Sequence, residues 1–167
     1  MEEKVEMKEE MKTQAERVPD MAAPRIFMGA DEKIVCEVNG FYDKETGFLE
    51  FVIPGAVART AEQFNIVKHE FVFSRIPYDR LNTYRTQSMM YNHEDRTSSV
   101  NVLKLRDFFW VFHLVDWNFT DGEGVKIPLT RDPNQALSDE SLAMLYRLPA
   151  SVLDTAMGIL ERRINIA

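Results

Sequence analysis

A chain of 167 residues and 19.4 kDa is long enough to bury one hydrophobic core without disulfides or structural metals. Its net charge of −7 at pH 7 argues against nucleic-acid binding, which needs clustered Lys and Arg to replace the counterions of phosphates. The single cysteine, Cys36, excludes an internal disulfide and a multi-cysteine zinc site, and we expect it to be a small buried side chain. No run has the ~20 apolar residues of a membrane helix, and the first residues do not resemble a signal peptide, so we expect a cytoplasmic protein.

Residues 1–30 are predicted to be a charged N-terminal arm and linker. Glu and Lys recur at helical spacing over residues 2–17, but few apolar side chains accompany them. We favour a frayed tail here, and an arm that folds onto a partner is the alternative. Pro19 and Pro24 mark the linker, and residues 31–167 follow as a single α+β domain.

The first part of this domain, residues 31–76, is predicted to be β-rich. Apolar residues recur with a period of two in 33–38 and again in 48–53, and the turn-forming run 43–47 between them indicates a hairpin. A third strand is expected over 67–75. Together these segments would form a small antiparallel sheet.

The second part, residues 77–167, is predicted to be mainly helical. We expect a polar loop at 92–99 and helices at 78–89, at 100–117, after Ser138 and from Pro149. Apolar side chains occur around much of the circumference of the helix at 100–117, so we expect it to be buried on more than one side. The predicted fold class is therefore α+β, with the sheet in the N-terminal half and a helical C-terminal half around this buried apolar helix.

The sequence carries no recognisable pattern of catalytic, nucleotide-binding or metal-ligating residues. The run GEG at 122–124 lacks the third glycine and the GK[ST] of a phosphate-binding loop. Oxygen-bearing side chains alternate from Asp116 as in a calcium loop, but Asp121 stands where Gly is required and Ile127 where Glu is required. The three histidines have neither an i, i+4 partner nor an HExxH context. We therefore predict no metal, no cofactor and no enzymatic activity.

The most distinctive stretch is 108–130, where a strongly apolar segment meets an aromatic turn. Aromatic residues beside glycines are common both in cores and in partner-binding grooves, so Trp117 has two interpretations, of which a core position is favoured. The candidate partner-binding residues of this stretch are Trp117, Asn118, Phe119, Asp121, Gly124, Ile127, Pro128 and Leu129.

Residues 107–164 resemble the C-terminal part of the tail-assembly chaperones of long-tailed bacteriophages. In that family an apolar helix runs into the pattern W-N-[FL]-T-D-x-x-G-x-x-[IL]-P-L-T, and a polar loop and a helix that starts with Leu-Pro follow. The resemblance covers about a third of this chain. The matching residues are Trp117, Asn118, Phe119, Thr120, Asp121, Gly124, Ile127, Pro128, Leu129, Thr130, Leu148 and Pro149.

The resemblance implies a non-enzymatic assembly factor in the host cytoplasm. Such proteins coat the aggregation-prone tape measure protein, bring tail tube subunits to polymerise around it, and leave before the tail is complete. The implied partners are these phage proteins or further copies of the chain, with neither nucleic acid nor a membrane. The alternative is a structural virion protein, such as a head decoration, a connector, a neck or a tail component, whose N-terminal arm makes lattice contacts. An unrelated enzyme or regulator is the third interpretation.

Overall fold

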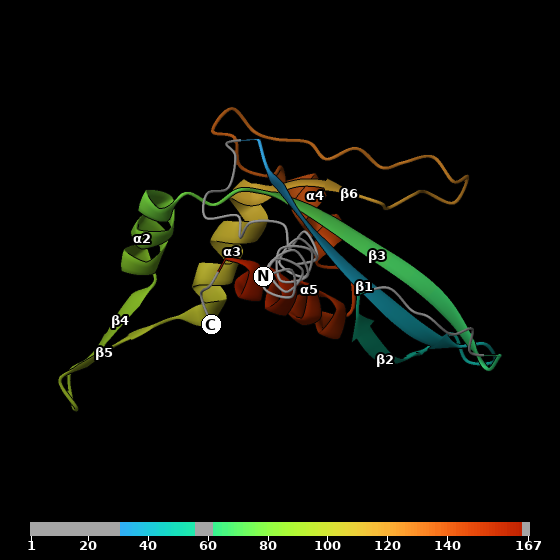
Figure 1. Ribbon diagram of the computed structural model, residues 1–167, viewed down its shortest axis with the longest axis horizontal. Coiled ribbons are helices and arrows are strands. Elements are labelled where there is room, and N and C mark those ends of the chain that lie inside the picture. Colours follow the sequence, from blue (N-terminus) through green and yellow to red (C-terminus); the bar gives the residue numbers. More distant parts are fainter. Residues whose placement is uncertain (1–30, 56–61, 165–167) are drawn as a thin grey trace, which may run out of the picture.

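The computed structural model describes residues 31–55 and 62–164, and the predicted arm and linker at 1–30 lie outside this part of the chain. Two antiparallel sheets and a set of short helices make up the described residues (Figure 1). In chain order the elements are β1 (Lys33–Asp43), β2 (Leu49–Pro54), β3 (Phe64–Ser74), α2 (Tyr78–Gln87), β4 (Met89–Asn92), β5 (Thr97–Val100), α3 (Val102–His113), β6 (Leu114–Trp117), α4 (Asp139–Leu145) and α5 (Ala150–Arg163).

The main sheet has four antiparallel strands in the order β2-β1-β3-β6, which confirms the predicted hairpin and third strand. β1 and β3 pair along their whole length, from Lys33 opposite Ser74 to Asp43 opposite Phe64. β2 pairs with β1 only from Val38 onward. The long strands β1 and β3 therefore form the central pair of the main sheet.

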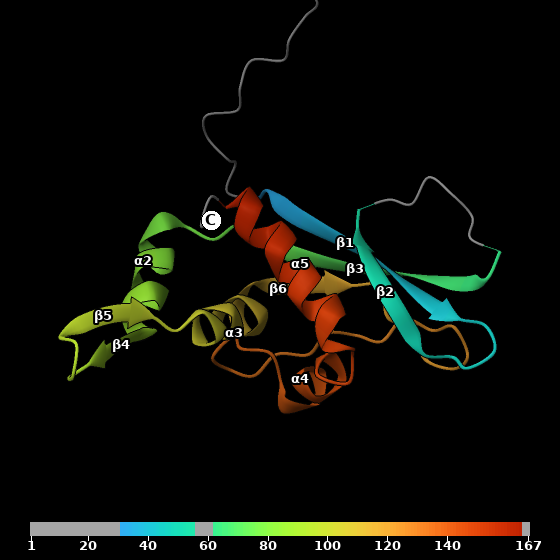
Figure 2. The ribbon, with the colours of Figure 1, turned by 90° about the horizontal axis from the view of Figure 1, so that it is seen from below.

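One face of the sheet carries the hydrophobic core. Ile34, Cys36 and Val38 of β1 are buried on it beside Phe71 and Phe73 of β3. α5 packs across β1 and β2, and α3 lies beside it on the same side of the sheet (Figure 2). Burial raises the pKa of the Cys36 thiol to about 11, so this cysteine is an inert core side chain, as expected.

The helix predicted at 100–117 is shorter than expected. It begins after Asn101, whose side chain accepts a hydrogen bond from the backbone N–H of Lys104, and it ends at His113. The chain then continues directly as β6, which pairs with β3 and places Trp117 opposite Phe71. Pairing with β6 satisfies backbone N–H and C=O groups of β3 that would stay unpaired at the sheet edge if the helix continued. This pairing explains why the helix ends earlier than predicted.

The expected burial of this helix is also only partly right. Leu105, Phe109 and Trp110 are buried in the core, as predicted. Val102 is exposed at the start of the helix, and Leu103 is 70% exposed. α3 is therefore buried along one side and presents apolar side chains to solvent at its N-terminal end.

The polar loop predicted at 92–99 is instead the turn and second strand of a hairpin. β4 and β5 pair from Met89 opposite Val100 to Asn92 opposite Thr97, and α2 ends two residues earlier than expected. Arg96, with φ of 53°, supplies the left-handed residue of the turn, and the side chain of Asn92 accepts a hydrogen bond from the backbone N–H of Glu94. These local bonds allow a polar sequence to close a tight hairpin.

The two C-terminal helices begin where the sequence predicts. The side chain of Ser138 accepts a hydrogen bond from the backbone N–H of Ser141 at the start of α4, and Pro149 immediately precedes α5. Arg106 of α3 donates to both carboxylate oxygens of Glu161 in α5, at 2.7 and 2.9 Å. This bidentate pair fixes the two helices against each other.

A buried histidine connects three elements of the fold. In the ring of His113, Nδ1 lies 3.0 Å from the hydroxyl of Ser74 in β3, and Nε2 lies 3.0 Å from the hydroxyl of Tyr84 in α2. Burial, assisted by the positive charge of Arg131, lowers the pKa of His113 to about 4. The neutral imidazole thus holds α2 against α3 and the sheet.

The shifted pKa of His113 predicts acid sensitivity. Between the unfolded value of 6.5 and the folded value of about 4, the unfolded chain binds more protons, so the free energy of unfolding falls as the pH drops through this window. Between pH 7 and pH 5 the expected loss from His113 is about 2 kcal/mol, and His69, whose pKa burial also lowers, acts in the same direction. Urea denaturation at about pH 7 and about pH 5 measures it.

His113→Gln should be less stable at neutral pH, and its stability should depend less on pH over this window. His93→Gln, in the exposed hairpin turn, is the matched control and should keep the full dependence. An unchanged pH dependence in His113→Gln would contradict this assignment.

Candidate functional site

Trp117, the most prominent residue of the predicted site, lies in the core. Its side chain is 1% exposed, and its indole Nε1 donates a 2.7 Å hydrogen bond to the carbonyl of Ile127. Its ring lies 4.7 Å from that of Phe119, which in turn meets Phe71 edge to face. Trp117 therefore anchors the segment after β6 onto the sheet and offers no surface to a partner.

Asn118 continues the sheet through its side chain. Its Oδ1 accepts a 2.9 Å hydrogen bond from the backbone N–H of Glu70, and its Nδ2 donates to the carbonyl of Lys68 at 2.8 Å. Its own backbone N–H donates to the carbonyl of Glu70 at 3.2 Å. The amide thus occupies the edge of β3 just beyond the end of β6, where an ordinary side chain would leave two backbone groups unpaired.

The segment from Asp121 to Gly124 is a turn held by its own side chains. Oδ1 of Asp121 accepts hydrogen bonds from the backbone N–H groups of Glu123 and Val125, both at 2.9 Å, and Gly124 has φ of +81°. Below the turn, Lys126 forms an ion pair of 2.7 Å with Asp116 of β6. The chain therefore leaves the sheet after β6, reverses at this turn and returns alongside itself.

The remaining candidates complete this small unit. Phe119, Ile127 and Leu129 are half-buried against the core, and Pro128 is exposed. The structure therefore brings the predicted residues together, but their contacts mainly fasten residues 117–129 to the sheet. The sequence pattern at 117–129 therefore corresponds to a segment that packs on the sheet more than to an exposed binding surface.

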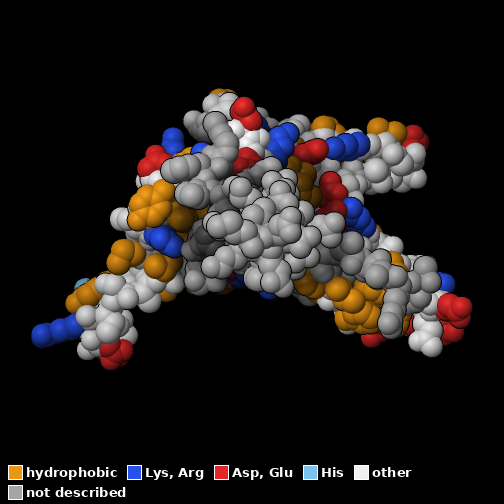
Figure 3. Space-filling model, viewed as in Figure 1, with side chains coloured by type: hydrophobic (Ala, Val, Ile, Leu, Met, Phe, Trp, Pro, Cys, Tyr) orange, Lys and Arg blue, Asp and Glu red, His pale blue; other side chains and the backbone are white. Residues whose placement is uncertain are grey.

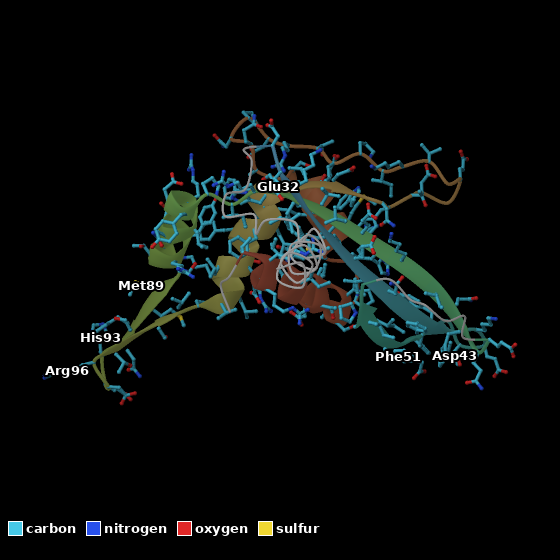
Figure 4. All side chains as sticks on the ribbon, in the orientation of Figure 1. Glu32, Asp43, Phe51, Met89, His93 and Arg96 are labelled. Carbon is cyan, nitrogen blue, oxygen red and sulfur yellow. The ribbon has the colours of Figure 1, made fainter. Side chains whose placement is uncertain are left out.

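Exposed apolar side chains also occur on α2, β4 and β5, which together we call the hairpin arm. Every side chain of β4 and β5 is exposed, and Met89, Met90, Tyr91 and Val100 are the apolar ones among them. The hairpin arm projects away from the sheet and helices, and Met89, His93 and Arg96 follow its length (Figures 1 and 4). A two-stranded sheet with neither face covered is marginally stable alone in water.

A second group of apolar side chains, the sheet-tip cluster, consists of Phe41, Phe48, Phe51 and Phe64. The rings of Phe41 and Phe51 stack at 4.4 Å, and that of Phe64 meets Phe51 edge to face at 5.4 Å. Phe48 and Phe51 are exposed. Apolar side chains gather both on the hairpin arm and near the sheet tip, at opposite ends of the molecule (Figure 3).

The sequence predicts the helix of the hairpin arm but not its two strands, because β4 and β5 have only four residues each. Such strands are too short to establish a period of two, and β4 follows directly after a helical pattern. The available signal was local: the apolar run 89–91 and the β-compatible run 97–100 flank the turn-forming residues 92–96.

Metal ligation and membrane spanning can be examined directly on the described residues. Among them, no group of three or more His, Cys, Asp or Glu could hold a metal ion, and no helix is long and apolar enough to cross a membrane. No protein-family model matches the chain, and neither a curated protein nor a solved structure matches it with significant similarity. The exposed surfaces of the described residues are therefore the main structural indication of function.

The anchoring role of Trp117 and Asn118 predicts losses of stability. Trp117→Ala should lower the free energy of unfolding by about 3–5 kcal/mol, because it leaves a large cavity and removes the donor to Ile127. Asn118→Asp should cost about 1–2 kcal/mol, because a carboxylate cannot donate to the carbonyl of Lys68. Pro128→Ala, at an exposed position of the same segment, should stay within about 0.5 kcal/mol. Chemical denaturation at pH 7 measures all three.

Proposed function

We propose that this chain is a non-enzymatic assembly factor of long-tailed bacteriophages that binds apolar segments of tape measure or tail tube proteins during tail morphogenesis. Two features support the proposal. Residues 107–164 resemble the tail-assembly chaperones, and the hairpin arm presents several exposed apolar side chains. The exposed hairpin arm is the observation that carries the proposal.

The hairpin arm has the physical properties of a reversible binding surface. Its two strands each have one unpaired edge, which can form backbone hydrogen bonds with an added strand. Met89 and Met90 are flexible and polarizable, so they adapt to partners of different shape. An uncovered two-stranded hairpin gains order when a partner packs on it, and the cost of that ordering keeps the affinity moderate. Moderate affinity suits a protein that must release its partner.

The net charge of −7 supports the same role. An acidic protein resists self-aggregation and holds an aggregation-prone apolar partner in solution as a charged complex. It also favours basic over acidic partner segments. Charge thus complements the apolar contacts without replacing them.

The second candidate function is that of a structural virion protein. It is favoured by one observation, the position of the sheet-tip cluster at the far end of the molecule from the hairpin arm. Two apolar surfaces at opposite ends suit a subunit that contacts two neighbours in a lattice. The two candidates differ in whether the protein stays in the finished particle.

The proposal predicts that the protein is required for tails and absent from purified particles. Mass spectrometry of finished virions should recover it far below the stoichiometry of any tail protein, while infected-cell lysates contain it together with tail proteins. Stoichiometric recovery from virions would contradict the chaperone role and support the structural one.

The hairpin arm should also determine partner capture. Combined replacement Met89→Ser and Tyr91→Ser removes two exposed apolar side chains and should reduce co-purification of tail proteins about tenfold or more. Val125→Ser, at a 60% exposed apolar position outside the hairpin arm, is the matched control and should leave recovery unchanged. Circular dichroism must show that both variants fold. Undiminished recovery with the double variant would contradict the proposal.

A further inference from the structure

A groove of about 150 Å³ lies between α3 and α5, close to the base of the hairpin arm. Its apolar lining comes from Leu103 and Trp110 of α3 and from Leu153 and Met157 of α5, and Tyr146 lies at one side. The two helices are neighbours that cross at an angle in the view from below (Figure 2). The groove is an opening between helices that the core does not fill.

The groove is continuous along the chain with the exposed hairpin arm. Val100 ends β5, and Val102 and Leu103 begin α3, and all three side chains are exposed. Leu103 lies three residues beyond the end of the hairpin arm and lines the groove. A partner segment bound at the base of the hairpin arm therefore has an apolar path into the groove.

The charges around the groove are unbalanced. Arg106 is its only lining cation, and it is already engaged by Glu161 at 2.7 Å and by Asp154 at 3.2 Å. Asp107 also lines the groove and forms no ion pair with any described residue. Among the described residues that line the groove, Asp107 and Asp154 thus outnumber Arg106, whose guanidinium is also bonded by Glu161 from outside the lining. The lining therefore carries a net negative charge beside apolar side chains.

The position of Asp107 makes its charge available to a ligand. Partial burial raises the pKa of Asp107, and burial together with the negative charge of Asp107 raises the pKa of Tyr146. Asp107 is nevertheless solvent-exposed, so a ligand in the groove can reach its carboxylate. A cationic group placed beside Asp107 would relieve this imbalance.

We propose that the groove between α3 and α5 binds a basic amphipathic helix of a partner protein, with an apolar side chain over Leu103 and a Lys or Arg beside Asp107. A helix fits better than an extended segment, because the walls are helices and offer no open strand edge to pair with. A helix satisfies its own backbone groups and needs only side-chain contacts. This inference rests on the proposed function and adds the chemistry of the partner.

The proposal is tested with a synthetic amphipathic helical peptide that carries a Leu stripe flanked by Lys, and with a second peptide in which Glu replaces every Lys. Isothermal titration calorimetry with the full chain measures the affinity of each. The Lys peptide should bind about tenfold tighter than the Glu peptide, and its affinity should fall with added salt. Equal affinity of the two peptides would overturn the proposal.

Variants of the full chain locate the binding. Leu103→Ser should weaken the Lys peptide about tenfold, and since Leu103 is largely exposed this change should leave folding intact. Asp107→Asn should weaken it about threefold and reduce the salt dependence. Val125→Ser is the control and should bind as the native chain does. Unchanged binding by both Leu103→Ser and Asp107→Asn would place the peptide elsewhere and overturn the proposal.

The outcomes separate this proposal from the proposed function. If hairpin-arm variants no longer recover tail proteins while Leu103→Ser and Asp107→Asn bind the peptide as the native chain does, the groove proposal fails and the proposed function stands. If the peptide binds in the groove while hairpin-arm variants still recover tail proteins, the groove proposal stands and the proposed function fails.

Discussion

The fold depends on the direct passage from α3 into β6 at His113 and Leu114. A helix that ends inside a protein leaves carbonyl groups unpaired, and here Arg131 donates to the carbonyls of Val111 and Leu114. The backbone N–H of Leu137 also donates to the carbonyl of Val111, at 2.9 Å. The segment between β6 and α4 must therefore return to this point. The short passage fixes α3 against β3, so the helix and the sheet share one core.

This constraint divides the molecule into a fixed body and an exposed arm. At the base, Tyr84 of α2 bonds to His113 and stacks on Phe108 at 4.7 Å, so the start of the hairpin arm is held firmly. Beyond that base, none of the residues that the structure describes covers either face of the hairpin. The hairpin arm is thus an apolar surface whose base is held in place and whose strands have few supporting contacts. Such a surface is suited to binding, because order and apolar burial both increase when a partner arrives.

The sequence predicts those elements whose signals are local and long enough to be periodic. The first hairpin, the third strand and the helix starts at Ser138 and Pro149 belong to this group. β6 was missed because its four residues extend an apolar helical pattern, and only pairing with Val72, far away in the chain, makes them a strand. The role of Asn118 was hidden for the same reason, since its partners lie in β3. The contacts of residues 117–129 with the sheet could not be predicted from their spacing, because their partners lie far away in the chain.

Hydrogen–deuterium exchange of the chain, alone and with co-purified tail proteins, tests most directly whether the partner binds the hairpin arm or the segment at 117–129. Because the hairpin is uncovered in the free chain, its backbone N–H groups should exchange rapidly there. The account predicts that partner binding slows exchange at 89–103 and leaves exchange at 117–129 unchanged. Slower exchange at 117–129 with an unaffected hairpin arm would contradict it.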